Sequence, residues 1–220
     1  MLKLNLFTTS VLVLTGFLTI ASVADANAGE IGMLQRVQTS HQMFKAGQND
    51  RDPLLIIAAA KLRKTAGLEK TNRNPQDGND TANTPDESTV LTWQSMLDVA
   101  RDLSVDDDLM LGLIDDIVAE NTKGVVNGPV YNIANIAAKK SDTYNAVPFE
   151  AAKYAEIYVE GQGSADLNLF VYDSKNRLVC SDSDASDIAY CGWRPNSSDG
   201  FSIKVTNKSN VATRYSLMTN

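Results

Sequence analysis

The chain has 220 residues, with 20 basic and 27 acidic side chains and a formal net charge of −7. This acidity disfavours the phosphate backbone of nucleic acid, so no nucleic-acid partner is expected. The sequence contains one histidine and two cysteines. These counts exclude a zinc site built on two histidines and a cluster held by four cysteines.

The N-terminal residues 1–28 have the pattern of a bacterial signal peptide. An apolar run over residues 4–20 follows Lys3, and small residues lead up to Ala28. Cleavage is expected near Ala28, or two residues earlier at Ala26; a short membrane anchor is the alternative. We therefore expect a periplasmic or secreted bacterial protein without a membrane span after cleavage.

Apolar residues recur at helical spacing in the first half, which predicts a helical domain over residues 29–124. Helices are expected over 30–46, from Pro53 with Asp52 as N-cap, over 89–103, and after Ser104 as N-cap; this order is typical of two stacked hairpins. The polar segment 69–88 cannot bury enough apolar surface to offset its ordering entropy, so it is expected to be a mobile loop.

From residue 130 onward the apolar residues alternate with period two, which predicts an antiparallel β-sandwich over residues 130–220. Leu167, Leu169 and Val171 are expected to face the core, and Phe170 and Tyr172 the opposite side. Eight strands are expected, over 130–137, 143–149, 155–160, 167–172, 178–180, 189–193, 201–206 and 214–218.

The second half resembles the bacterial pre-peptidase C-terminal domain. The motifs that carry the resemblance are DTY at 142–144, VPF at 147–149, AEIYVEG at 155–161, DLNLFVYD at 166–173, CGWRP at 191–195, GFSIKVTN at 200–207 and YSLMTN at 215–220. The resemblance implies a jelly-roll-like β-sandwich of the kind that usually accompanies secreted peptidases and other exported enzymes. Some relatives bind calcium or extracellular polymers such as collagen and carbohydrate.

This sequence departs from that family in two respects. A short helical region, and not a peptidase domain, precedes the module, and Asn168 stands where the family often has the second Asp of an Asp-x-Asp pair. The fold class predicted for the whole chain is α+β in two domains, a small all-α helical-hairpin domain followed by an antiparallel jelly-roll-like β-sandwich.

The two cysteines, Cys180 and Cys191, would lie in an oxidising compartment after export. An even number of cysteines there favours a structural disulfide, and a pair of free thiols is the alternative.

The loop between the cysteines is acidic, with Asp182, Asp184 and Asp187. Calcium takes several oxygen ligands from loops of this kind, so Ca²⁺ is the one cofactor considered, with Asp166 and Asp173 as further ligands that only the fold could bring near. The spacing does not match an EF-hand, and a plain solvated turn is the alternative.

Three aromatic residues, Phe170, Tyr172 and Trp193, are candidates for a ligand platform that stacks on sugar rings or on peptide side chains. Packing within the core or on the sheet is the alternative use of such residues.

Catalytic sets are not found in the sequence. The only histidine, His41, lies within the first predicted helix, and no serine stands in a Gly-x-Ser-x-Gly motif. We therefore expect a non-catalytic exported protein whose sandwich is a binding or interaction module for a protein, a glycan or another extracellular polymer. The alternative is an accessory or inhibitory partner of an exported hydrolase or peptidase that acts through the helical domain.

Overall fold

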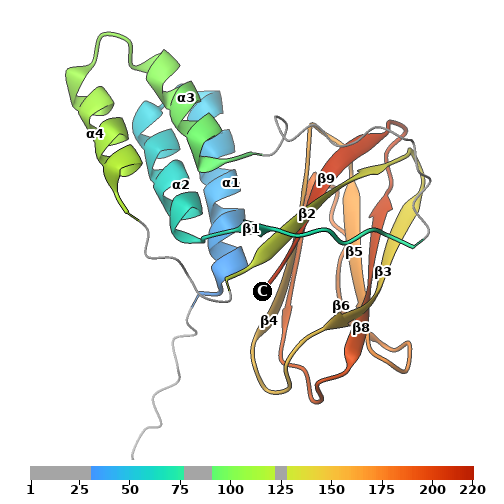
Figure 1. Cartoon of the computed structure of the whole chain (residues 1–220). Helices are drawn as coiled ribbons and strands as arrows, with labels where there is room; N and C mark the ends of the chain where they lie inside the picture. The colour runs from blue at the N-terminus through green and yellow to red at the C-terminus, as the bar shows by residue number, and fades with distance from the viewer. Residues whose placement is uncertain (1–30, 77–90, 122–127) are drawn as a thin grey trace, which may run out of the picture. The chain divides into compact units, whose positions relative to one another are not determined.

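The computed structural model describes residues 31–76, 91–121 and 128–220, so the predicted signal peptide lies outside the described residues. These ranges contain four helices and nine strands (Figure 1). The helices are α1 (Met33–Asp50), α2 (Pro53–Thr65), α3 (Trp93–Leu103) and α4 (Asp108–Ala119). The strands are β1 (Glu69–Lys70), β2 (Val130–Ile136), β3 (Ser141–Pro148), β4 (Ala155–Gly161), β5 (Leu167–Tyr172), β6 (Leu178–Asp182), β7 (Ile188–Trp193), β8 (Gly200–Asn207) and β9 (Thr213–Thr219).

The start of α2 follows the sequence prediction. The carboxylate of Asp52 accepts a hydrogen bond from the backbone N–H of Leu55 at 3.1 Å, and Pro53 occupies the first helical position. The predicted cap of α4 is wrong, because Asp107 and not Ser104 precedes the helix and accepts from two backbone amides of its first turn. Ser104 instead begins a short turn, in which its carbonyl accepts from the N–H of Asp107 at 3.0 Å.

The helices bury their apolar stripes against one another. Phe44 of α1, Ile56 of α2, Met96 of α3 and Ile114 of α4 belong to one buried cluster, so all four helices share a core. Helical spacing of apolar residues therefore located this core correctly.

The strands form two sheets, with the orders β1-β2-β9-β4-β7 and β3-β8-β5-β6. All pairings are antiparallel except the short parallel pairing of β1 with β2. The eight predicted strands are present as β2 to β9, and the β-sandwich is confirmed; β1 was not predicted.

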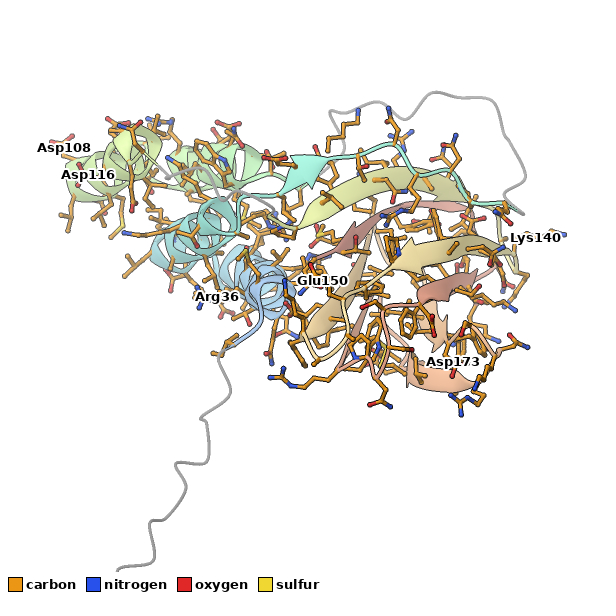
Figure 2. All side chains as sticks on the ribbon, turned by 60° about the horizontal axis from the view of Figure 1, so that its bottom comes forward. Arg36, Asp108, Asp116, Lys140, Glu150 and Asp173 are labelled. Carbon is orange, nitrogen blue, oxygen red and sulfur yellow. A yellow bond between two sulfur atoms is a disulfide. The ribbon has the colours of Figure 1, made fainter. Side chains whose placement is uncertain are left out.

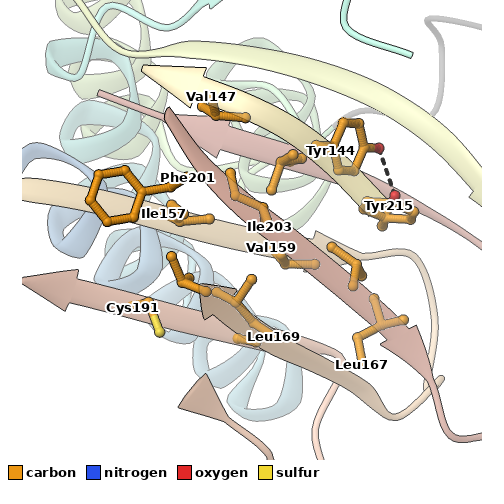
Figure 3. Close-up of a cluster of buried hydrophobic side chains, with 14 of the residues drawn as sticks. Tyr144, Val147, Ile157, Val159, Leu167, Leu169, Cys191, Phe201, Ile203 and Tyr215 are labelled. Carbon is orange, nitrogen blue, oxygen red and sulfur yellow. Dashed lines mark hydrogen bonds between the residues drawn. The ribbon is translucent and has the colours of Figure 1, made fainter. Parts of the chain in front are cut away.

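The core lies between the two sheets (Figure 3). Leu167, Leu169 and Val171 are fully buried there, as their alternation predicted. Two tyrosines also enter this core, and the hydroxyl groups of Tyr144 and Tyr215 lie 2.6 Å apart (Figure 3).

Residues 69–76 run along the edge of the sandwich, where the sequence predicted the first part of a mobile loop (Figure 1). The N–H of Thr71 donates to the carbonyl of Tyr131 on β2 at 2.8 Å, and the N–H of Gln76 donates to the carbonyl of Thr143 on β3 at 2.8 Å. These bonds pair the edge strands of both sheets and offset the cost of ordering the segment. The remainder of the predicted loop, residues 77–88, lies outside the described residues.

Residues 31–220 form one compact unit, and the predicted division into a helical and a β domain is not confirmed. A mixed cluster joins the two parts: Leu34 and Val37 of α1 pack with Tyr158 of β4 and Met218 of β9, all four with 0% exposure. Across the described ranges, no helix combines the length and the apolar character that crossing a membrane requires.

Candidate functional site

The outer face of β4 lies against the helices. Ile157 and Val159 point into the sandwich core, so Glu156, Tyr158 and Glu160 point the other way. These three side chains are nevertheless 1%, 0% and 5% exposed, because α1 and α2 cover them. We call this contact surface, formed by Glu156, Tyr158 and Glu160 with α1 and α2, the junction.

At one end of the junction, Glu156 caps α1. Its carboxylate accepts hydrogen bonds from the backbone N–H groups of Leu34 at 3.3 Å and Gln35 at 3.1 Å, and from the hydroxyl of Tyr190 at 2.9 Å. The N-cap residue of α1, Gly32, has no side chain that could do this. A carboxylate from the sandwich thus satisfies the first turn of a helix and complements its dipole.

At the other end, Arg63 of α2 forms a two-point ion pair with Glu160. Its Nη1 lies 3.1 Å from Oε1 and its Nη2 lies 2.6 Å from Oε2. Tyr158 donates its hydroxyl to Oε2 at 3.1 Å, and the same guanidinium donates to the carbonyl of Leu91 at 2.8 Å and to the hydroxyl of Ser40 at 3.3 Å. The buried guanidinium and the buried carboxylate are therefore both paired, as burial of charge requires.

His41 of α1 lies beside this pair and is only 5% exposed. Its Nδ1 is 3.3 Å from Oε2 of Glu160, a contact that is not counted as a hydrogen bond. Its Nε2 is 4.0 Å from Oδ2 of Asp187, and Nζ of Lys45 is 3.5 Å from that same oxygen. This end of the junction therefore gathers the carboxylates of Glu160 and Asp187, two basic side chains and one imidazole.

Electrostatics keep the central carboxylate ionised. Burial alone would raise the pKa of Glu160, but the charge and the hydrogen bonds of Arg63, together with the neighbouring imidazole of His41, lower it to about 2. Burial raises the pKa of Tyr158 well above its usual value, and the neighbouring Glu160 charge adds to this effect. Tyr158 therefore stays a neutral hydrogen-bond donor to a charged acceptor.

A pocket of about 230 Å³ opens beside this network, between α1 and the turn that follows β4. It is lined by one face of α1, by the end of β4 with the turn that follows it, by Leu91 before α3 and by Ser216 on β9. The lining residues are His41, Phe44, Lys45, Gln48, Leu91, Glu160, Gly161, Gln162, Gly163 and Ser216.

The predicted disulfide is confirmed, because Cys180 and Cys191 are bonded. Cys180 lies on β6 and Cys191 on β7, which belong to different sheets. The bond therefore joins the two layers of the sandwich at the ends of the acidic loop.

Four of the five aspartates considered for calcium are engaged in different places. Asp173, which Figure 2 labels, accepts from Arg177 on its own turn. Asp182 accepts from the N–H of Tyr190 and Asp184 from the hydroxyl of Ser186, whereas Asp187 forms an ion pair with Lys45. One oxygen of Asp166 is buried without a partner. Among the described residues, no three acidic, histidine or cysteine side chains are grouped as a metal site, and calcium binding stays a prediction.

The three aromatic residues of the predicted platform are not together. Phe170 and Tyr172 are half-buried on the outer side of β5. Trp193 lies on the other sheet, with its ring 5.0 Å from that of Phe149 and 5.4 Å from that of Phe201, both core residues. Only the pair on β5 can form an outward surface.

Sequence reasoning did not identify the junction. Glu156, Tyr158 and Glu160 alternate with core residues, which is the pattern of a strand with one solvated face. Arg63 lies in the last turn of its own helix, where a cation is favourable without any partner from the sandwich. The clue available in the sequence was the lone His41, whose burial a one-dimensional pattern does not reveal.

No protein-family model matches the sequence, and no curated protein matches it. Solved structures do show similarity. The pre-peptidase C-terminal domain of a collagenase from Bacillus anthracis is 12% identical, with 40% of this chain and 88% of that chain covered and a TM-score of 0.34. PliG from Aeromonas hydrophila, a periplasmic inhibitor of g-type lysozyme, is 13% identical, with 42% and 84% covered and a TM-score of 0.33.

A third similar structure is the BiXyn10A carbohydrate-binding module, which is 17% identical, with 42% of this chain and 74% of that chain covered and a TM-score of 0.27. The resemblance to the pre-peptidase C-terminal domain, first seen in the sequence motifs, is thus found among the solved structures as well, over 40% of this chain.

Proposed function

We propose that this chain is an exported, non-catalytic binding protein whose sandwich holds a protein, a glycan or another extracellular polymer. The binding surface is the outer face of the sheet β3-β8-β5-β6. One observation carries this proposal. In the described part of the chain the helices pack on the other sheet, through β4 and β7, and leave this face uncovered.

Two aromatic side chains project from the middle of that face. Phe170 is paired in register with Lys204 on β8, and Tyr172 with Ser202. Both aromatic side chains are half-buried, and Lys204 has no carboxylate partner within the described residues. Adjacent aromatic rings with polar neighbours supply a large contact area together with hydrogen-bonding groups, which suits a polymer binder.

Two further observations support the proposal. The disulfide is of the kind that persists in oxidising compartments, in agreement with the predicted export. The junction supports the proposal that the protein is non-catalytic, because its ion pair and its carboxylate cap each join a helix to the sandwich. The charged groups there therefore hold the structure together.

The test compares the full mature chain with the Phe170→Ala/Tyr172→Ala variant. Binding to immobilised collagen, peptidoglycan and insoluble polysaccharides is measured by pull-down and depletion. We expect the variant to bind the recognised polymer at least about tenfold more weakly, since aromatic anchors dominate such contacts. The control is Tyr154→Ala, which removes an exposed tyrosine that precedes β4 on the other sheet. Equal binding by the wild type and the Phe170/Tyr172 variant would contradict the proposed surface.

A second candidate function is an accessory or inhibitory partner of an exported hydrolase. The observation that favours it is the apolar exposure of α4 and the turn before it, where Val105, Leu109 and Val118 are 71%, 69% and 53% exposed. Inhibition of peptidase or lysozyme activity by the wild type, lost in Leu109→Asp/Val118→Asp and kept in Phe170→Ala/Tyr172→Ala, would favour this candidate.

A further inference from the structure

We propose that the pocket beside the junction binds one uncharged, hydroxyl-bearing ring, such as a neutral sugar residue. This site is separate from the face of Phe170 and Tyr172, because it lies between α1 and the turn after β4. Its volume of about 230 Å³ exceeds the roughly 150 Å³ of a cavity that holds benzene and falls short of the roughly 300 Å³ at which drug-sized pockets begin. The space therefore suits a single ring.

The charges around the pocket cancel. Lys45 is matched by Asp187 at 3.5 Å, and Glu160 is matched by Arg63 at 2.6 Å. An anion would approach two carboxylates and a cation would approach two basic groups, so a charged ligand would give up its hydration without gaining a net opposite charge. This balance selects an uncharged ligand.

The pocket also contains polar groups that the protein leaves unused. The side chains of Gln48 and Gln162 and the hydroxyl of Ser216 make no hydrogen bond within the described part of the chain. Nδ1 of His41 is buried and has no hydrogen-bond partner there either. Amide and hydroxyl groups each offer both donors and acceptors, which is the pattern that ring hydroxyls match.

The remaining walls suit the carbon face of such a ring. Phe44, which is 6% exposed, and Leu91 supply an aromatic and an aliphatic wall. Gly163 has φ +94° and open space around the position of a Cβ, so no side chain fills this side of the pocket. Apolar walls with a few convergent polar groups are typical of small-ligand sites.

The single histidine makes the test direct, because His41 gives the only imidazole NMR signals of the chain. The full mature chain is titrated with methyl glycosides of glucose, galactose, mannose and N-acetylglucosamine, and with short oligosaccharides that end in the same residues. We expect at least one neutral glycoside to shift the His41 signals saturably. A site for free sugars binds the glycoside as tightly as the oligosaccharide, whereas a site for glycan ends binds the oligosaccharide more tightly.

Matched variants separate the pocket from the rest of the molecule. Gln48→Ala and Gln162→Ala should each weaken binding about 2- to 10-fold, as the loss of one hydrogen bond does. Gln42→Ala, which removes an exposed glutamine of the same helix outside the pocket, should leave binding unchanged. Phe170→Ala/Tyr172→Ala should also leave it unchanged, so this proposal and the proposed function can fail separately.

Two outcomes overturn the proposal. In the first, no neutral glycoside shifts the His41 signals, or the shift is as large in Gln48→Ala and Gln162→Ala as in the wild type. In the second, glucuronate or glucosamine binds more tightly than the neutral ring with the same hydroxyl pattern, which would contradict the charge balance.

Discussion

Arg63 on α2 and Glu160 on β4 lie 97 positions apart in the chain and form a buried two-point ion pair, with N–O distances of 3.1 and 2.6 Å. This pair ties the helices to the sandwich. Removing one partner of such a pair leaves a buried charge without compensation and costs about 3–5 kcal/mol, whereas replacing both by apolar groups is often close to neutral. We therefore expect the pair to fix how the helices dock on the sandwich, with little net gain in stability.

The Glu156 cap of α1, at the other end of the junction, predicts that a substitution at Gly32 lowers stability. A Cβ on Gly32 would overlap the carboxylate of Glu156, so Gly32→Ala must displace the group that caps α1. We expect a loss of about 1–3 kcal/mol in the free energy of unfolding, measured by urea titration. The control is Gly112→Ala on α4, where no atom lies within 4 Å of the added Cβ. It should be neutral or stabilising by up to about 1 kcal/mol, and equal losses in both variants would refute the cap.

Acid stability depends on Glu160. Its pKa falls from the ordinary 4.5 to about 2 in the folded protein, so its contribution is complete above about pH 4.5 and is lost as the pH falls towards 2. The whole window is worth about 3 kcal/mol. Unfolding free energies at several pH values should show a steep slope in the wild type and in Glu150→Gln, an exposed control (Figure 2). Glu160→Gln should flatten this slope; an unchanged slope would disprove the assignment.

The disulfide predicts a simple loss of stability. It closes a short loop and joins the two sheets, so Cys180→Ser/Cys191→Ser should lower the free energy of unfolding by about 2–3 kcal/mol. The intact mass after alkylation without reductant should show no modified thiol in the wild type. Modification of both cysteines in that experiment would show that the bond does not form in the exported protein.

Calcium gives a sharp thermal test. Four of the five carboxylates considered as ligands are engaged with different partners, and Asp173, for example, is held by Arg177 and by the N–H of Lys175. We therefore expect millimolar calcium to leave the Tm within about 1 °C of its value in chelator, because a ligand stabilises only the state that it binds. A rise of several degrees, lost in Asp182→Asn/Asp184→Asn, would instead establish a site in the acidic loop.

Local patterns predicted much of the fold because the responsible forces act locally. Period-two alternation placed Leu167 and Leu169 in the core, and Asp52 followed by Pro53 located the start of α2. The disulfide followed from two cysteines in a chain that the sequence predicts to be exported.

The junction could not be predicted in the same way. In the sequence pattern, Glu160 is an ordinary outward-facing residue of a strand. Only the tertiary fold covers it with a helix and brings Arg63 to it. Short β1 was missed for a similar reason, because Glu69 and Lys70 pair with β2 through their backbone and carry no apolar signal. The strand pattern predicted that Phe170 and Tyr172 share one face. It could not predict that Trp193 lies on the other sheet, because strand pairing depends on the tertiary fold.

The most direct measurement asks whether the helices and the sandwich unfold together. The chain has two tryptophans, Trp93 on α3 and Trp193 on β7. In Trp93→Phe, fluorescence reports the sandwich through Trp193, while far-UV circular dichroism of the same sample reports mainly the helices. Because the Arg63–Glu160 pair and the Glu156 cap join the two parts, the guanidinium midpoints of both probes should coincide, and Arg63→Met should shift them together. Helical structure lost at a clearly lower denaturant concentration than the Trp193 signal would contradict a single cooperative unit.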